Sequence, residues 1–120
     1  MLGTLANAVI IVVALLHFLF MVLESFLWTK PFGRKVFGLS EAQASETATL
    51  ALNQGFYNGF LGAGLVWGLV DSKDAFGIKV FFLVCVLIAG IVGGFTAKRS
   101  ILWIQAAPAA VALALLLLSR

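Results

Sequence analysis

The chain has 120 residues, of which 62% are hydrophobic and only 11% are charged, and its mean hydropathy is +1.12. Soluble domains carry about 25% charged residues to cover their surface, so this composition excludes an ordinary soluble domain. The formal charge of +3 comes from lysines and arginines in loops, which favours membrane topology and lipid headgroups over nucleic-acid binding. Because Cys85 is the only cysteine, no intrachain disulfide can form.

The first apolar segment runs from about residue 5 to 28. It lacks the basic start of a signal peptide and is too long for its hydrophobic core, so we expect a retained first span. A loop is predicted at residues 29–39, where Pro31, Gly33 and Gly38 act as helix breakers. Its aromatic residues alternate with Lys30, Arg34 and Lys35, which is typical of a segment in the headgroup layer.

The remaining apolar segments predict spans at about 47–70, 76–96 and 101–118. Ser40 and Gln43 match a capping box, so the second long helix should begin near Glu41. The turns after residues 70 and 96 are short and polar, which favours antiparallel neighbours. The sequence therefore predicts an all-α polytopic membrane protein, with one domain forming an antiparallel four-helix transmembrane bundle.

Orientation is predicted from the basic residues. Five lysines and arginines fall in the loops on one side of the predicted bundle, and three fall on the side of the termini. The positive-inside rule then places both termini outside the cell.

Seven polar side chains interrupt the predicted spans. Polar groups are costly in a bilayer unless they are paired, so such a cluster is a candidate functional site. Counted from the basic side, an outer ring would lie one turn deep and a deeper ring near the middle of the membrane. The outer ring is Glu24, Asn53, Gln54 and Gln105, and the deeper ring is His17, Tyr57 and Asn58.

Simpler interpretations of these residues stay open at this stage. Glu24 could reach the interface or pair with a loop cation, and His17 could be a packing histidine. Asparagine and glutamine can also join helices by hydrogen bonds, although four hydrogen-bonding side chains within six residues, from Asn53 to Asn58, is a high density for that role. Pro108, just after Gln105, could simply kink its helix.

The run Asn53-Gln54-Gly55-Phe56-Tyr57-Asn58-Gly59-Phe60-Leu61, together with Glu24 and the segment from Gln105 to Ala109, resembles a small bacterial integral membrane family. That family is the domain of unknown function 1304, and the resemblance covers essentially the whole chain. It implies four spans in the bacterial inner membrane and no established biochemistry.

Three functions are compatible with these observations. The favoured hypothesis is binding, with transport as an extension, of a small molecule, ion or lipid head in the polar pocket. The alternatives are a membrane-embedded acid/base enzyme acting on a lipid or isoprenoid, and an accessory subunit of a larger membrane complex. No cofactor or metal is expected because no such motif is present. Homo-oligomerisation is predicted through glycine faces such as Gly64/Gly68 or Gly90/Gly94.

Overall fold

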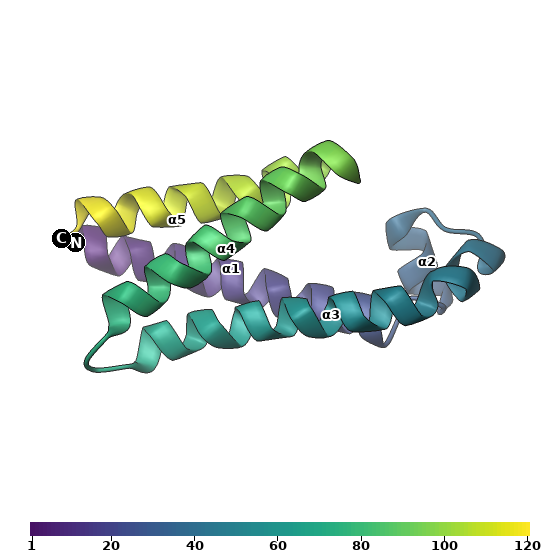
Figure 1. Ribbon diagram of the computed structural model, residues 1–120, viewed down its shortest axis with the longest axis horizontal. Coiled ribbons are helices and arrows are strands. Elements are labelled where there is room, and N and C mark those ends of the chain that lie inside the picture. The colour runs from purple at the N-terminus through teal and green to yellow at the C-terminus, as the bar shows by residue number, and fades with distance from the viewer. The chain divides into compact units, whose positions relative to one another are not determined.

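The computed structural model describes residues 1–120, and all of its regular structure is helical (Figure 1). The predicted all-α class is confirmed. The elements are α1 (Leu2–Ser25), α2 (Pro31–Phe37), α3 (Glu41–Val70), α4 (Ala75–Thr96), the π-helical turn η1 (Leu102–Ala106) and α5 (Ala107–Leu118).

The structure divides into two compact units, and the single domain stays a prediction. The central unit is Leu16–Phe60, and the terminal unit combines Met1–Leu15 with Leu61–Arg120. Helices α1 and α3 each contribute one part to both units.

Two helices are long and apolar enough to cross a membrane, namely α1 and α4. At 1.5 Å per residue they measure about 36 and 33 Å, against about 30 Å for a bilayer core. The helical stretch Leu102–Leu118 is apolar but shorter, and α3 is not among the candidate spans. A four-helix transmembrane bundle is therefore not confirmed, and four crossings stay a prediction.

In the central unit, the predicted loop at residues 29–39 contains the short helix α2, which the sequence analysis missed. Pro31 is its first residue, a position where the missing N–H costs nothing. The helix ends at Gly38, whose φ of 66° lies in the left-handed region. The N–H groups of Gly38 and Leu39 donate to the carbonyls of Lys35 and Arg34, which is a Schellman motif. The breakers thus delimit a helix of seven residues.

The predicted capping box is confirmed at the start of α3. The backbone N–H of Ser40 donates to Gln43 Oε1 at 2.9 Å, and the N–H of Gln43 donates to Ser40 Oγ at 3.1 Å. Two orphan donors at the helix end are satisfied in this way, and α3 begins at Glu41 as expected.

Small residues bring α1 and α3 together within the central unit. A Cβ atom on Gly55 would lie 2.9 Å from the backbone nitrogen of Ser25, and one on Gly59 would lie 2.5 Å from Met21 Sδ. The absence of a side chain at these two glycines therefore permits the close approach of the two helices. Ser25 Oγ also donates to the Leu52 carbonyl at 3.0 Å, which joins the two helices further.

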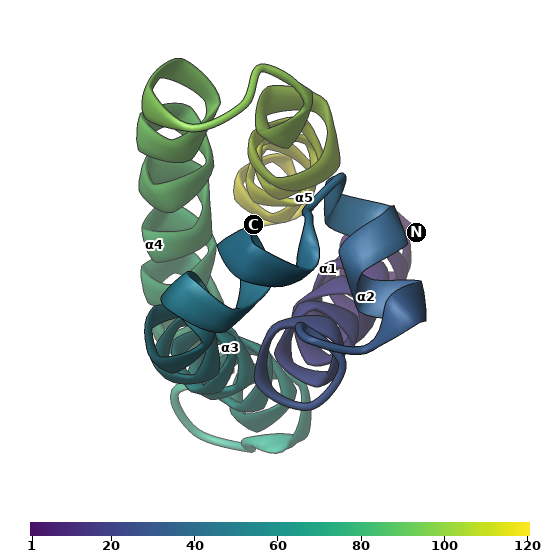
Figure 2. The same ribbon diagram turned by 90° about the vertical axis from the view of Figure 1, so that its right-hand side faces the viewer.

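In the terminal unit, α4 packs against η1 and α5. The helix α4 and the η1–α5 segment lie next to each other in both views (Figures 1 and 2). Gly90 and Gly94 of α4 are buried at this contact. A Cβ on Gly90 would lie 2.6 Å from the backbone nitrogen of Ala106, and one on Gly94 would lie 3.3 Å from that of Leu102. Both glycines are needed for the helices to approach.

The π turn η1 accompanies Pro108. The N–H of Ala107 donates to the carbonyl of Leu102, five residues back, instead of four. Pro108 is the second residue of α5 and has no N–H to continue the α-helical ladder. A wider turn before the proline relieves the contact of its ring with the carbonyls of the preceding turn, which we take as the physical reason for η1.

Glycines of α3 also contact α4 in the terminal unit. Gly64 faces the ring of Phe82, and a Cβ on Gly68 would lie 3.2 Å from the backbone nitrogen of Lys79. The two glycine pairs predicted as oligomer faces thus pack inside this unit, and homo-oligomerisation stays a prediction. Lys79 is only 9% exposed, and its Nζ donates to Asn7 Oδ1 of α1 at 2.8 Å.

Candidate functional site

The site is organised around Glu24, near the end of α1 in the central unit. The carboxylate is half-buried, and Asn58 Nδ2 on α3 donates to Glu24 Oε1. Asn58 is only 7% exposed, so a neutral buried amide holds one oxygen of the only acidic side chain on α1. The close packing at Gly55 and Gly59 brings the two helices near enough for this bond.

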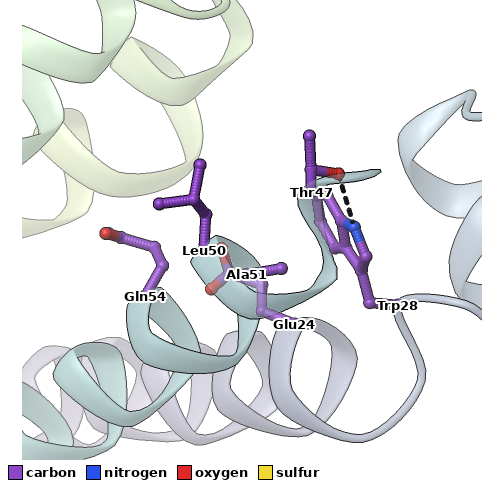
Figure 3. Close-up of a pocket in the computed structure, with 6 residues that line it drawn as sticks. All are labelled: Glu24, Trp28, Thr47, Leu50, Ala51 and Gln54. Atoms are coloured by element: carbon purple, nitrogen blue, oxygen red, sulfur yellow. Dashed lines mark hydrogen bonds between the residues drawn. The ribbon is translucent and has the colours of Figure 1, made fainter. Parts of the chain in front are cut away.

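An open pocket of about 280 Å³ lies beside this carboxylate (Figure 3). Figure 3 shows Leu50 and Gln54 on one side, Trp28 and Thr47 on the other, and Glu24 with Ala51 between them. Glu24 is the only charged side chain in the lining. The pocket thus combines a carboxylate, an indole ring, a carboxamide and aliphatic surface.

The indole of Trp28 is held in place from two directions. Its Nε1 donates to Thr47 Oγ1 at 3.0 Å, and the Thr47 hydroxyl donates in turn to the Gln43 carbonyl at 2.7 Å. The ring also packs against Phe37 of α2, with centroids 4.7 Å apart. Trp28 is therefore a fixed wall of the pocket, with its polar N–H already satisfied.

The α3 side of the pocket comes from a single helix face. The lining residues Thr47, Leu50, Ala51 and Gln54 are spaced at i, i+3, i+4 and i+7. This is the spacing of neighbours on one side of an α-helix. Glu24 is in the last turn of α1, and Trp28 lies in the turn that follows the end of this helix at Ser25.

The structure brings together part of the predicted cluster. Glu24 and Asn58 are bonded, and Glu24 and Gln54 share the pocket. Asn53 is exposed, and its Nδ2 donates to the Thr49 carbonyl of its own helix at 2.8 Å. Tyr57 is 57% exposed, with its ring near Phe60. None of the pairings of Glu24 with Lys30, Arg34 or Lys35 that we considered is formed, because its hydrogen bond comes from Asn58.

His17 and Gln105 lie outside the pocket lining. His17 is only 1% exposed, and its ring meets Phe20 edge-on with centroids 5.5 Å apart. Gln105 is half-buried within η1, in the terminal unit. His17 and Gln105 are thus not among the residues that line this pocket, and ligand binding by any of the seven residues stays a prediction.

Four lining residues were missed as site residues, namely Trp28, Thr47, Leu50 and Ala51. Trp28 ends the first predicted span, and the others are not conspicuous by type. Their helical spacing from Gln54 was the available signal. No group of three or more His, Cys, Asp or Glu side chains gathers where a metal could bind.

Comparison with known proteins agrees with the motif. A family model described as "Protein of unknown function (DUF1304)" matches residues 11–117. The chain is also 32% identical over 105 residues to "Uncharacterized protein YpaA" of Lactococcus lactis subsp. lactis (strain IL1403), covering 86% of this chain and 88% of that protein. No solved structure matches. The resemblance predicted from Glu24, the Asn53–Leu61 motif and the Gln105–Ala109 segment is therefore confirmed. This chain belongs to the DUF1304 family.

Proposed function

We propose that the chain is a multi-pass protein of the bacterial inner membrane that binds a small positively charged molecule in the pocket beside Glu24. Helices α1 and α4, which have the length and apolarity of membrane spans, support the location. Transport of the bound molecule is the natural extension of this proposal, since a binding site within a span is the first requirement of a carrier.

Exposed apolar side chains also support a bilayer location. Soluble monomers rarely expose contiguous apolar patches of more than a few hundred Å². On this chain large hydrophobic residues are exposed along both α1 and α4; examples are Leu5, Ile11, Leu15, Leu19, Phe81, Ile88, Val92 and Phe95. Lipid chains are the surroundings in which such helix surfaces are stable.

The chemistry of the lining supports a cation as ligand. A carboxylate that leaves water loses its favourable hydration. An opposite charge nearby compensates best for this loss, because it stabilises the ionised form. Glu24 has a neutral hydrogen-bond donor in Asn58, so its charge is left to be balanced by what enters the pocket. The indole of Trp28 adds the negative π face that attracts ammonium groups, and Gln54 adds a carbonyl acceptor. This pairing of Glu24 with Trp28 is the observation that carries the proposal.

The size of the pocket limits the ligand. Sites for drug-sized molecules measure about 300–1,000 Å³, so about 280 Å³ suits a small ammonium compound with few heavy atoms. Choline is a suitable probe because its neutral isostere, 3,3-dimethylbutan-1-ol, has the same shape without the charge.

Calorimetric titration of the full chain in a maltoside detergent tests the proposal. We expect saturable binding of choline and at least tenfold weaker binding of the neutral alcohol. Glu24→Gln should weaken choline binding at least tenfold, since two unit charges about 4 Å apart attract by about 4 kcal/mol at an effective dielectric constant of about 20, and about 1.4 kcal/mol is tenfold in affinity. Glutamine retains an acceptor for Asn58, so this variant removes the charge and keeps the helix contact.

Glu41→Gln and Glu46→Gln are matched controls, because both carboxylates are exposed on α3 and neither lines the pocket. Both variants should bind choline as the parent chain does. Equal affinity for choline and its isostere, or an unchanged affinity in Glu24→Gln, would show that the pocket does not select a cation.

A further inference from the structure

A second surface of the central unit is formed by α2 and carries three basic side chains. Residues 25–40 contain Lys30, Arg34 and Lys35 and no acidic residue. These cations therefore form a local positive charge on and beside α2, and the nearest acidic residues in the sequence, Glu24 and Glu41, flank this stretch. Five residues separate the start of α2 from the end of α1, which is a candidate membrane span.

One face of α2 is attached to the protein. Gly33 is buried, and a Cβ placed on it would collide with the Leu27 carbonyl and lie 3.2 Å from the Trp28 nitrogen. Phe37, four residues later on the same face, packs on the Trp28 ring. This face fixes how α2 is rotated.

An adjoining edge of α2, about 100° round the helix from this face, exposes two large apolar residues. Phe32 is 63% exposed and Val36 is 46% exposed, and their spacing of four residues makes them one edge of the helix. Lys35 is exposed beside this edge. An apolar edge with a basic flank is the pattern of a helix that lies in the interface of a membrane.

Arg34 provides a further indication. It is half-buried, and its Nε is shielded from solvent without a hydrogen-bond partner in the protein. Guanidinium groups form bidentate hydrogen bonds to phosphate oxygens, and rotation of the Arg34 side chain toward the surface would present its unpaired Nε to a lipid phosphate.

From these observations we propose that α2 is an interfacial helix that binds the headgroups of anionic phospholipids. Phe32 and Val36 enter the acyl region, and Lys30, Arg34 and Lys35 contact lipid phosphate. This inference rests on the bilayer location proposed above, but it does not depend on cation binding beside Glu24. The two surfaces carry opposite charges and serve different ligands.

Fluorescence quenching of Trp28 by brominated lipids tests the proposal. Trp28 packs against α2, whereas Trp67 and Trp103 are exposed, so Trp67→Phe with Trp103→Phe leaves one reporter beside α2. The full chain is reconstituted into nanodiscs of phosphatidylglycerol and phosphatidylcholine, with one of the two lipids brominated near the headgroup. Quenching by either brominated lipid reports bilayer location, and the ratio of the two reports lipid preference.

We expect phosphatidylglycerol to be preferred near Trp28 by at least fivefold. Each basic side chain at a membrane surface favours anionic lipid by about fivefold, so replacing Lys30, Arg34 and Lys35 by glutamine should abolish the preference. Exchanging the same positions, as Lys30→Arg, Arg34→Lys and Lys35→Arg, keeps the charge and should keep the preference. Helicity measured by circular dichroism confirms folding of each variant.

A positional control separates a local site from net charge. Glutamine at Lys73, Lys98 and Arg99 removes the same total charge from other loops and should leave the preference at Trp28 within about twofold. An equal loss in that control, a preference that survives neutralisation of α2, or competition by millimolar inorganic phosphate would each overturn the proposal. Absence of quenching by both brominated lipids would instead contradict the bilayer location itself.

Discussion

The packing of α4 against η1 predicts opposite effects for the same substitution at two positions of one helix. Gly90 and Gly77 are both in α4. A Cβ on Gly90 would lie 2.6, 2.9 and 2.9 Å from the nitrogen, Cα and Cβ of Ala106, whereas a Cβ on Gly77 meets nothing within 4 Å. We therefore expect Gly90→Ala to destabilise the protein and Gly77→Ala to stabilise it.

The magnitude follows from two opposing terms. Alanine gains about 1 kcal/mol over glycine in a helix at either position. At Gly90 the new methyl group is about 0.8 Å too close to a backbone atom, compared with an ordinary contact of 3.4 Å or more. Overpacking of this kind costs about 1–3 kcal/mol. Because the propensity gain cancels between the variants, their difference in unfolding free energy isolates the overpacking cost and should be about 1–3 kcal/mol.

The assay is reversible unfolding in mixed micelles, followed by far-ultraviolet circular dichroism as the fraction of denaturing detergent rises. The parent chain and both variants are measured under one condition, so that detergent effects are shared. If the two variants differ by less than about 0.5 kcal/mol, the close contact of Gly90 with Ala106 does not exist in solution and the packing described for α4 is wrong.

Three further predictions use the same assay. Asn58→Ala should lower the unfolding free energy by about 0.6–1.7 kcal/mol, the range for hydrogen bonds between membrane helices, whereas Glu24→Gln should lower it less because an acceptor remains; equal losses would contradict the observed bond. Lys79→Met should leave the unfolding free energy nearly unchanged. Asn7→Leu should lower it by about 1–3 kcal/mol, because it leaves the buried Lys79 cation without its acceptor. A larger loss in Lys79→Met than in Asn7→Leu would refute the pairing. The N–H groups of Asp74 and Lys73 lower the pKa of Asp71 below its ordinary value of 3.8, so Asp71→Ala should destabilise at neutral pH. That difference should shrink as the pH falls below 3.8, since the group contributes stability only while ionised, and a constant difference from neutral pH to about pH 2 would argue against it.

Local signals in the sequence predicted local structure well. Apolar runs located all four long helical stretches, and Ser40 with Gln43 gave the start of α3 through the hydrogen bonds that are now seen. Pro31 and Gly38 were interpreted as breakers of a loop, but each residue is also favoured at a helix boundary. The seven residues of Pro31–Phe37 are enough for two turns, and only the tertiary contact of Gly33 with Leu27 and Trp28 decides for a helix.

The candidate site was predictable only in part, for a geometric reason. Gln105 belongs to the π turn η1, whose side chains leave the regular α-helical register on which counting 3.6 residues per turn relies. Asn53 was expected to point inward and instead bonds the carbonyl of Thr49. Thr47, Leu50 and Ala51 carry no chemical signal of their own, and they become part of a pocket only when α1 ends beside them.

The two ends of the chain meet within the terminal unit, as Figure 1 shows. A Cβ on Gly3 would lie 3.9 Å from Ser119 Cβ, and Arg120 lies over the ring of Phe76 at 4.1 Å. In a bilayer, ends that touch must emerge on the same side, so the number of crossings has to be even. Two halves of a split fluorescent protein fused to the ends should therefore reassemble in one compartment, and failure to reassemble would contradict an even number of crossings.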